Sequence, residues 1–103
     1  MSELPKAFKN FTEDYPKVAE AYEKLGTEVH SAGPLDEKTR ALIKLSIAIG
    51  GRMEGAVHSH THKALDAGCT KEEIKQTVLL SLTTIGLPSM MAAMTWVNDI
   101  LEA

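Results

Sequence analysis

Apolar residues recur every three or four positions along nearly the whole chain, and the alternating pattern of a half-buried strand is absent. Glycine and proline interrupt this pattern at intervals typical of helices. The length of 103 residues is close to the commonest size of one domain. We therefore predict a single all-α domain over residues 1–103, with about five to six helices.

The first third of the chain predicts two amphipathic helices. A short N-terminal piece has apolar positions at Leu4, Phe8 and Phe11. A second helix has Pro16 in its first turn, and Gly26 is expected to end it. The apolar stripe of this second helix consists of Tyr15, Val18, Tyr22 and Leu25.

The middle of the chain predicts two central helices. Asp36 places negative charge at the start of the first, and the segment 41–49 is apolar on almost all sides, so this helix should be buried. Gly50 ends it. The second helix runs from about Arg52 to Ala67 and stops at Gly68, because glycine readily adopts the left-handed conformation of a helix C-terminus.

The next helix begins with a capping-box signature, Thr70 followed three residues later by Glu73. Cys69 and Ile74 occupy the two positions of a hydrophobic staple, which gives the single cysteine a structural role. Cys69 could instead be a reactive thiol, since it lies just before a helix N-terminus. Gly86 is expected to end the helix, whose apolar residues are Ile74, Val78, Leu79, Leu82 and Ile85.

Pro88 opens the last predicted helix, whose packing seam consists of Met90, Met94, Val97 and Leu101. The late helices carry more apolar surface than one small bundle is expected to cover. We therefore expect a homo-oligomer that buries part of this surface between subunits.

Composition excludes several classes of partner. Eleven basic and 14 acidic residues give a net charge of -3 without a basic cluster, so nucleic acid is not an expected partner. No apolar run reaches the roughly 20 residues that span a bilayer, and the N-terminus lacks a signal-peptide pattern. We expect a cytoplasmic protein that does not bind membranes. One cysteine cannot form a disulfide within a chain.

Three histidines, His58, His60 and His62, stand at alternate positions of one predicted helix. At about 100° per residue, His58 and His62 lie about 40° apart, whereas His60 lies on the opposite side of the helix. The three residues therefore cannot all serve one purpose, and each side needs its own interpretation.

His60 is the polar member of an otherwise apolar face, together with Met53, Ala56, Val57 and Ala64. One interpretation is a general acid or base in a small pocket lined by these four residues. The other is a core histidine with satisfied hydrogen bonds. The short side chains at 56 and 64 leave room beside the ring and favour the pocket.

Glu54, His58 and His62 share the other face at spacings of four residues. Imidazole and carboxylate at this spacing can hold a divalent metal ion. Glu54 and His62 are about 12 Å apart along the axis, so a site would use one adjacent pair and ligands from elsewhere. The alternative is a polar face stabilised by ordinary pairing between turns. No cofactor is otherwise expected.

These residues belong to a longer series of motifs along the chain. The motifs are Thr39-Arg40-Ala41-Leu42, Glu54, His60, Ala64, Gly68, Glu72-Glu73-Ile74, Gly86-Leu87-Pro88 and Ala92-Ala93. From about residue 35 to 101, the chain resembles the carboxymuconolactone decarboxylase family, which includes the alkylhydroperoxidase D-like proteins. The resemblance implies an all-α fold and a trimer or hexamer with active sites near the subunit boundaries.

The chain differs from the peroxidase branch of that family at the reacting residues. The two cysteines of the family's Cys-x-x-Cys-x-x-x-His motif fall on Met53 and Ala56, its glutamate falls on Ala41, and only the histidine remains, as His60. Methionine and alanine cannot cycle between dithiol and disulfide. The resemblance therefore does not imply peroxide reduction for this chain.

The decarboxylase branch also lacks the cysteine pair and keeps the histidine. The resemblance implies cofactor-free decarboxylation of a lactone or related small carboxylated molecule, with His60 as the proton donor. No arginine on the same face is evident, and Arg40 and Arg52 are the possible substitutes. Two alternatives stay open: a metal-binding protein, and a non-catalytic member of the family.

Overall fold

A computed structural model describes residues 5–103, and every regular element within that range is helical. Six helices have nine residues or more, and α6 is a single short turn. In chain order they are α1 (Lys6–Asp14), α2 (Pro16–Ser31), α3 (Glu37–Gly50), α4 (Glu54–Asp66), α5 (Lys71–Leu80), α6 (Leu82–Ile85) and α7 (Leu87–Leu101). The all-α prediction is confirmed. Contacts divide the chain near residue 35 into two compact units, which are described separately.

The N-terminal unit, up to Leu35, contains α1 and α2. Phe11 on α1 packs against two other aromatic rings: its ring centroid lies 6.3 Å from that of Phe8 on the same helix and 6.2 Å from that of Tyr15, which lies between the two helices. Neither helix contains a fully buried residue. Leu4, the first apolar position expected for α1, lies outside the described residues.

The expected stop at Gly26 is wrong, because α2 continues to Ser31. Glycine ends a helix when it adopts a positive φ, and among the described glycines only Gly68 and Gly86 do so. An interior glycine costs about 1 kcal/mol relative to alanine, which the rest of a 16-residue helix tolerates.

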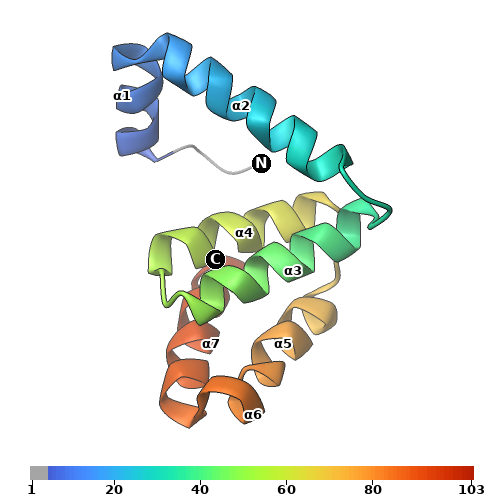
Figure 1. Cartoon of the computed structure of the whole chain (residues 1–103). Helices are drawn as coiled ribbons and strands as arrows, with labels where there is room; N and C mark the ends of the chain where they lie inside the picture. Colours follow the sequence, from blue (N-terminus) through green and yellow to red (C-terminus); the bar gives the residue numbers. More distant parts are fainter. Residues whose placement is uncertain (1–4) are drawn as a thin grey trace. The chain divides into compact units, whose positions relative to one another are not determined.

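Residues 36–103 form the second unit, in which α3 and α4 lie side by side and run in opposite directions (Figure 1). The Asp36 side chain starts α3 by accepting a hydrogen bond of 2.8 Å from the Thr39 backbone N–H. Only one face of α3 is fully buried, so the expectation of burial on almost all sides is only partly met. Ile43 and Ile47 remain 40% and 67% exposed.

The end of α4 follows the prediction, since Gly68 has φ of +92°. The backbone N–H of Cys69 donates to the carbonyl of Ala64, and that of Gly68 donates to the carbonyl of Leu65. This pair of bonds is a Schellman motif, which satisfies carbonyls that the helix end would leave free. It also leads directly into the next helix.

The capping box that starts α5 is confirmed: the backbone N–H of Thr70 and the side chain of Glu73 bond at 2.8 Å, and the reciprocal bond measures 3.1 Å. The expected single helix up to Gly86 is interrupted near Ser81, whose hydroxyl donates to the Val78 carbonyl at 2.6 Å. Gly86 then turns the chain with φ of +99°.

The core of this unit is made where α3, α4, α5 and α7 meet. Met90, Val97 and Leu101 of the expected α7 seam are buried, and Met94 packs against them. The core consists of Leu45, Ala48, Ile49, Val57, Ala64, Cys69, Ile74, Val78, Met90, Ala93, Val97 and Leu101. None of the described helices is long and apolar enough to cross a bilayer.

Candidate functional site

The buried stripe of α4 separates its functional side chains into two groups. Val57, Thr61 and Ala64 have no exposed surface, and their spacing of four and three residues forms one helix face. Thr61 is tolerated there because its hydroxyl donates a 2.7 Å hydrogen bond to the Val57 carbonyl. The sequence analysis did not place Thr61 in the core, because threonine is a polar residue.

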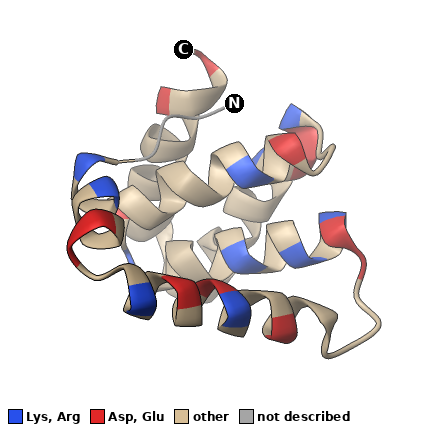
Figure 2. Cartoon of the chain, turned by 90° about the horizontal axis from the view of Figure 1, so that it is seen from above, with Lys and Arg blue, Asp and Glu red and all other residues tan. Residues whose placement is uncertain are grey.

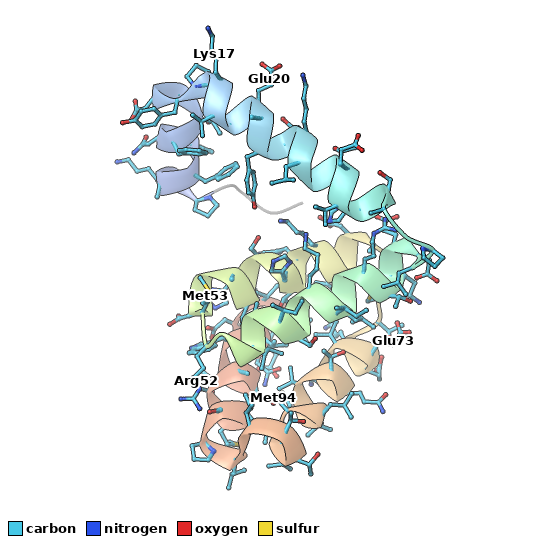
Figure 3. All side chains as sticks on the ribbon, viewed as in Figure 1. Lys17, Glu20, Arg52, Met53, Glu73 and Met94 are labelled. Atoms are coloured by element: carbon cyan, nitrogen blue, oxygen red, sulfur yellow. The ribbon has the colours of Figure 1, made fainter. Side chains whose placement is uncertain are left out.

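The residues expected to line a His60 pocket differ in burial. Met53 precedes the first turn of α4 and is 60% exposed, so within one chain it is open to solvent. Figure 3 shows it beside Arg52 in the turn between α3 and α4, at the opposite end of the unit from Glu73. Val57 and Ala64 are core residues with no exposed surface, whereas Ala56 and His60 are half-buried beside them. The buried face is therefore centred on Thr61 rather than on His60.

His60 lies in a partly buried, cationic environment. Burial lowers the pKa of its imidazole below the usual 6.5, and the positive charges of Lys63 and Lys44 lower it further. Its imidazole is therefore neutral at neutral pH. A neutral imidazole can accept a proton and, once protonated, can donate it to a reacting group.

The cationic group extends along α3. Burial lowers the pKa of Lys44, and the charges of Lys63 and Arg40 lower it as well. Arg40 and Lys44 are four residues apart on α3, and His60 and Lys63 are three residues apart on α4, so each pair lies on one helix face. The sequence contained this spacing, but only the packing of α3 on α4 places the two pairs together.

Arg52, the other substitute expected for a substrate-binding arginine, is not among the charges that lower the pKa of His60. It occupies the turn before α4 with φ of +56°, a left-handed conformation that is uncommon outside glycine.

Figure 2 shows basic and acidic positions interspersed along the helices rather than gathered into one charged face. The cationic group around His60 is therefore local.

The other side of α4 holds an acidic group. The His58 Nε2 atom lies 3.0 Å from Asp99 Oδ2 on α7. One ligand atom each from Glu54, His58 and Asp99 lie within 4.8 Å of one another. Glu54 and His58 come together as the sequence predicted, but the third member is Asp99. His62, one turn further along α4, is not part of this cluster.

His58 shares a face of α4 with Glu54, as expected, but this face is not wholly exposed. His58 is half-buried and contacts α7. Asp99 was missed because it is 41 residues away in sequence and follows no motif spacing. One signal in the sequence could have indicated a positively charged partner for Asp99. It is an acidic residue in the last turn of α7, where the helix dipole disfavours negative charge.

Cys69 is buried, as the staple interpretation requires, and Ile74 is buried in the same core. Its Sγ lies 3.7 Å from the carbonyl of Lys38. Burial raises the pKa of the thiol, and the Glu73 carboxylate raises it further. The side chain is thus held as a protonated thiol, which is a weak nucleophile.

The structure also has an open groove of about 600 Å³ between α3 and the α5–α6 segment. None of the three α4 histidines lines it. Its lining is mostly apolar and hydroxyl-bearing, with one carboxylate and one amide; the residues are Leu42, Ile43, Ser46, Ile49, Gly50, Glu73, Gln76, Thr77, Leu80, Ser81, Thr84 and Ile85. The groove and the histidine-bearing sides of α4 are therefore separate features.

The helical architecture and the histidine-bearing α4 place the protein among all-α proteins with a central helical hairpin. Residues 16–99 match the model of the carboxymuconolactone decarboxylase family. Because this match spans most of the chain, the chain belongs to the carboxymuconolactone decarboxylase family.

The chain is also similar to three uncharacterised proteins. An uncharacterised protein of Haemophilus influenzae is 36% identical over 61% of this chain and 56% of its own length, so the chain spans just over half of that relative. Two uncharacterised proteins of Methanocaldococcus jannaschii are each 34% identical, over 80% and 84% of this chain and 80% and 78% of their own lengths.

A solved structure shares the fold. The apo form of a carboxymuconolactone decarboxylase family protein from Legionella pneumophila superposes with a TM-score of 0.80 at 24% identity, covering 93% of this chain and 86% of that one. The expected fold family is therefore confirmed, while the chemistry has to be argued from this chain's own residues.

Proposed function

We propose that this protein is a lyase of the decarboxylase type that acts on a small carboxylated lactone or a related carbonyl compound, with His60 as its acid–base residue. The observation that carries this proposal is the half-buried imidazole of His60, whose pKa is lowered by burial and by the positive charges of Lys63 and Lys44. These cations suit a substrate carboxylate, and the imidazole suits proton transfer to carbon.

The negative charge of the bound substrate would favour protonation of His60. A bound carboxylate offsets the lysine charges that lower the pKa of His60, so its arrival raises that pKa and favours the protonated imidazole. The bond to the departing carboxyl group breaks, CO₂ leaves, and the electron pair passes into the conjugated carbonyl. The imidazolium N–H then protonates the resulting carbanion at carbon, and water returns a proton to His60.

The same site would be completed by other subunits. Large apolar side chains remain exposed in the unit that holds the core, namely Ile43, Ile47, Met53, Leu79, Leu80, Leu82, Leu87 and Met91. Such residues favour burial against another copy of the chain, and the family resemblance suggests a trimer or hexamer. Half-burial of His60 in one chain is compatible with a pocket that a neighbour closes.

Decarboxylation of a carboxylated muconolactone by wild type, His60→Ala and His62→Ala tests the proposal. We expect His60→Ala to lower kcat/KM by about 100-fold or more, the usual contribution of an acid–base residue, and His62→Ala to stay within about twofold. Light scattering should show the same oligomer in all three.

Equal turnover by wild type and His60→Ala would remove His60 from the mechanism. No turnover by the wild type across a panel of carboxylated lactones and β-keto acids would instead support the non-catalytic alternative. Peroxide reduction by a dithiol is not expected, because Met53 and Ala56 occupy the cysteine positions.

A further inference from the structure

Glu54, His58 and Asp99 form a cluster that the decarboxylase chemistry does not use. Glu54 and His58 are one turn apart at the start of α4, and Asp99 lies in the last turn of α7, which packs against α4. Three potential ligand atoms within 4.8 Å of one another thus come from two helices that the core already holds together.

We propose that this cluster is a binding site for one divalent transition-metal ion, with Glu54, His58 and Asp99 as its three protein ligands. Bonds of about 2.0–2.2 Å to zinc place neighbouring donor atoms of a tetrahedron ~3.3 Å apart. The His58 Nε2 and Asp99 Oδ2 atoms are already 3.0 Å apart. Small side-chain rotations would bring the third donor to the same spacing.

The charges of the cluster favour a cation. Two carboxylates face one imidazole, and they balance the two positive charges of a divalent ion when the imidazole is neutral. Asp99 lies at the negative end of the α7 dipole, where a carboxylate is unfavourable unless a positive charge is close. A metal ion relieves this repulsion more completely than the single hydrogen bond to His58.

The donor set selects the class of metal. One imidazole nitrogen with two carboxylate oxygens suits Zn²⁺ and its first-row neighbours better than Ca²⁺, which prefers six to eight oxygens. Glu54 and Asp99 are exposed and His58 is half-buried, so an ion can enter from solvent. Three ligands leave the fourth position of a tetrahedron open to water.

The sequence alone suggested a different ligand set, with His62 as a member. The two sets can be separated, because His58 and His62 are also spaced to chelate a metal from one helix face. His62 therefore provides a matched control on the same helix. It has the same side chain and lies one turn away, outside the cluster.

The experiment titrates Zn²⁺ into tag-free, chelator-treated protein in competition with a chromophoric chelator. We expect about one Zn²⁺ per chain in the wild type, at least tenfold weaker binding in His58→Ala and Asp99→Asn, and a change below about twofold in His62→Ala. Glu54→Gln should weaken binding by at least tenfold as well. Circular dichroism checks that each variant is folded.

Thermal unfolding supplies a second measurement. A ligand that binds only the folded state raises the melting temperature, so saturating Zn²⁺ should stabilise wild type and His62→Ala but not Asp99→Asn. Less than one Zn²⁺ per several chains would overturn the proposal. Loss of binding in His62→Ala with full binding in Asp99→Asn would also overturn it, because the ion would then be held by the histidine pair on α4.

Discussion

His58 and His60 are two residues apart on α4, yet their surroundings carry opposite charge. His60 lies near Lys63 and Lys44, and its pKa is lowered, whereas His58 contacts Asp99 and shares a cluster with Glu54. The helix turns about 200° between the two positions, so the difference follows from which neighbouring helix each ring approaches. One helix can therefore offer a proton-transfer residue on one side and a cation site on the other.

The two sides are kept apart by the buried stripe of Val57, Thr61 and Ala64. These residues hold α4 at a fixed rotation against the rest of the core. A rotation of the helix by one residue, about 100°, would move both histidines away from their present neighbours. The comparison thus predicts that the stripe matters more for stability than either histidine does.

The largest stability effect is expected from the stripe. Val57→Ala removes two buried methyl groups, so the free energy of unfolding should fall by about 2 kcal/mol, as measured by urea denaturation. Thr61→Val is the matched control, because it keeps the shape and loses only a local hydroxyl bond. It should change stability by less than about 1 kcal/mol. Equal losses in both variants would contradict this view of the stripe.

The next effect comes from reversing the charge beside His60. Lys63→Glu gives this side of α4 the acidic character of the other, so the pKa of His60, followed by NMR titration, should rise. The proposed carboxylate site should weaken at the same time, and kcat/KM should drop on the order of tenfold, or ~1.4 kcal/mol. Lys75→Glu on α5 is the control and should change neither quantity. An unchanged His60 pKa in Lys63→Glu would contradict the claim that the charge beside His60 lowers its pKa.

The smallest effect is a change in pH dependence. The folded pKa of His60 is below the unfolded value of 6.5, so the unfolded chain binds more protons as pH falls through 6.5. His60 therefore costs no stability above about pH 6.5 and lowers stability progressively below it, down to its folded pKa. Urea denaturation of His60→Gln should show a flatter decline with acidification than the wild type. Parallel curves would mean that the ring is not held neutral.

The helical fold was predictable because its signals are local. Caps at Asp36 and Thr70 and the glycine stop at Gly68 depend on residues three or four positions apart, and all are present in the structure. The incorrect helix end at Gly26 also has a local physical cause. A glycine without a positive φ does not end a helix, and α2 continues past Gly26.

The candidate sites were less predictable, because each depends on contacts between helices. Periodicity separated His58 from His60 correctly, but the neighbours that decide their chemistry, Asp99 and Lys44, lie on α7 and α3. The buried threonine was missed for the opposite reason, since a bond to its own helix made a polar residue suitable for the core. Spacing within α4 therefore explains the buried threonine, but it does not identify the partners of His58 and His60 on α7 and α3.

The start of α4 also has a consequence for protein engineering. Met53 caps this helix and Ala56 is its third residue, so both stand where the first turn's unpaired N–H groups and dipole favour a thiolate. The resemblance to the peroxidase branch of the family aligns its two redox cysteines with these positions, and Met53 is open to solvent. Met53→Cys with Ala56→Cys would therefore place two thiols at Cys-x-x-Cys spacing at a helix N-terminus, the setting that lowers the pKa of a thiol.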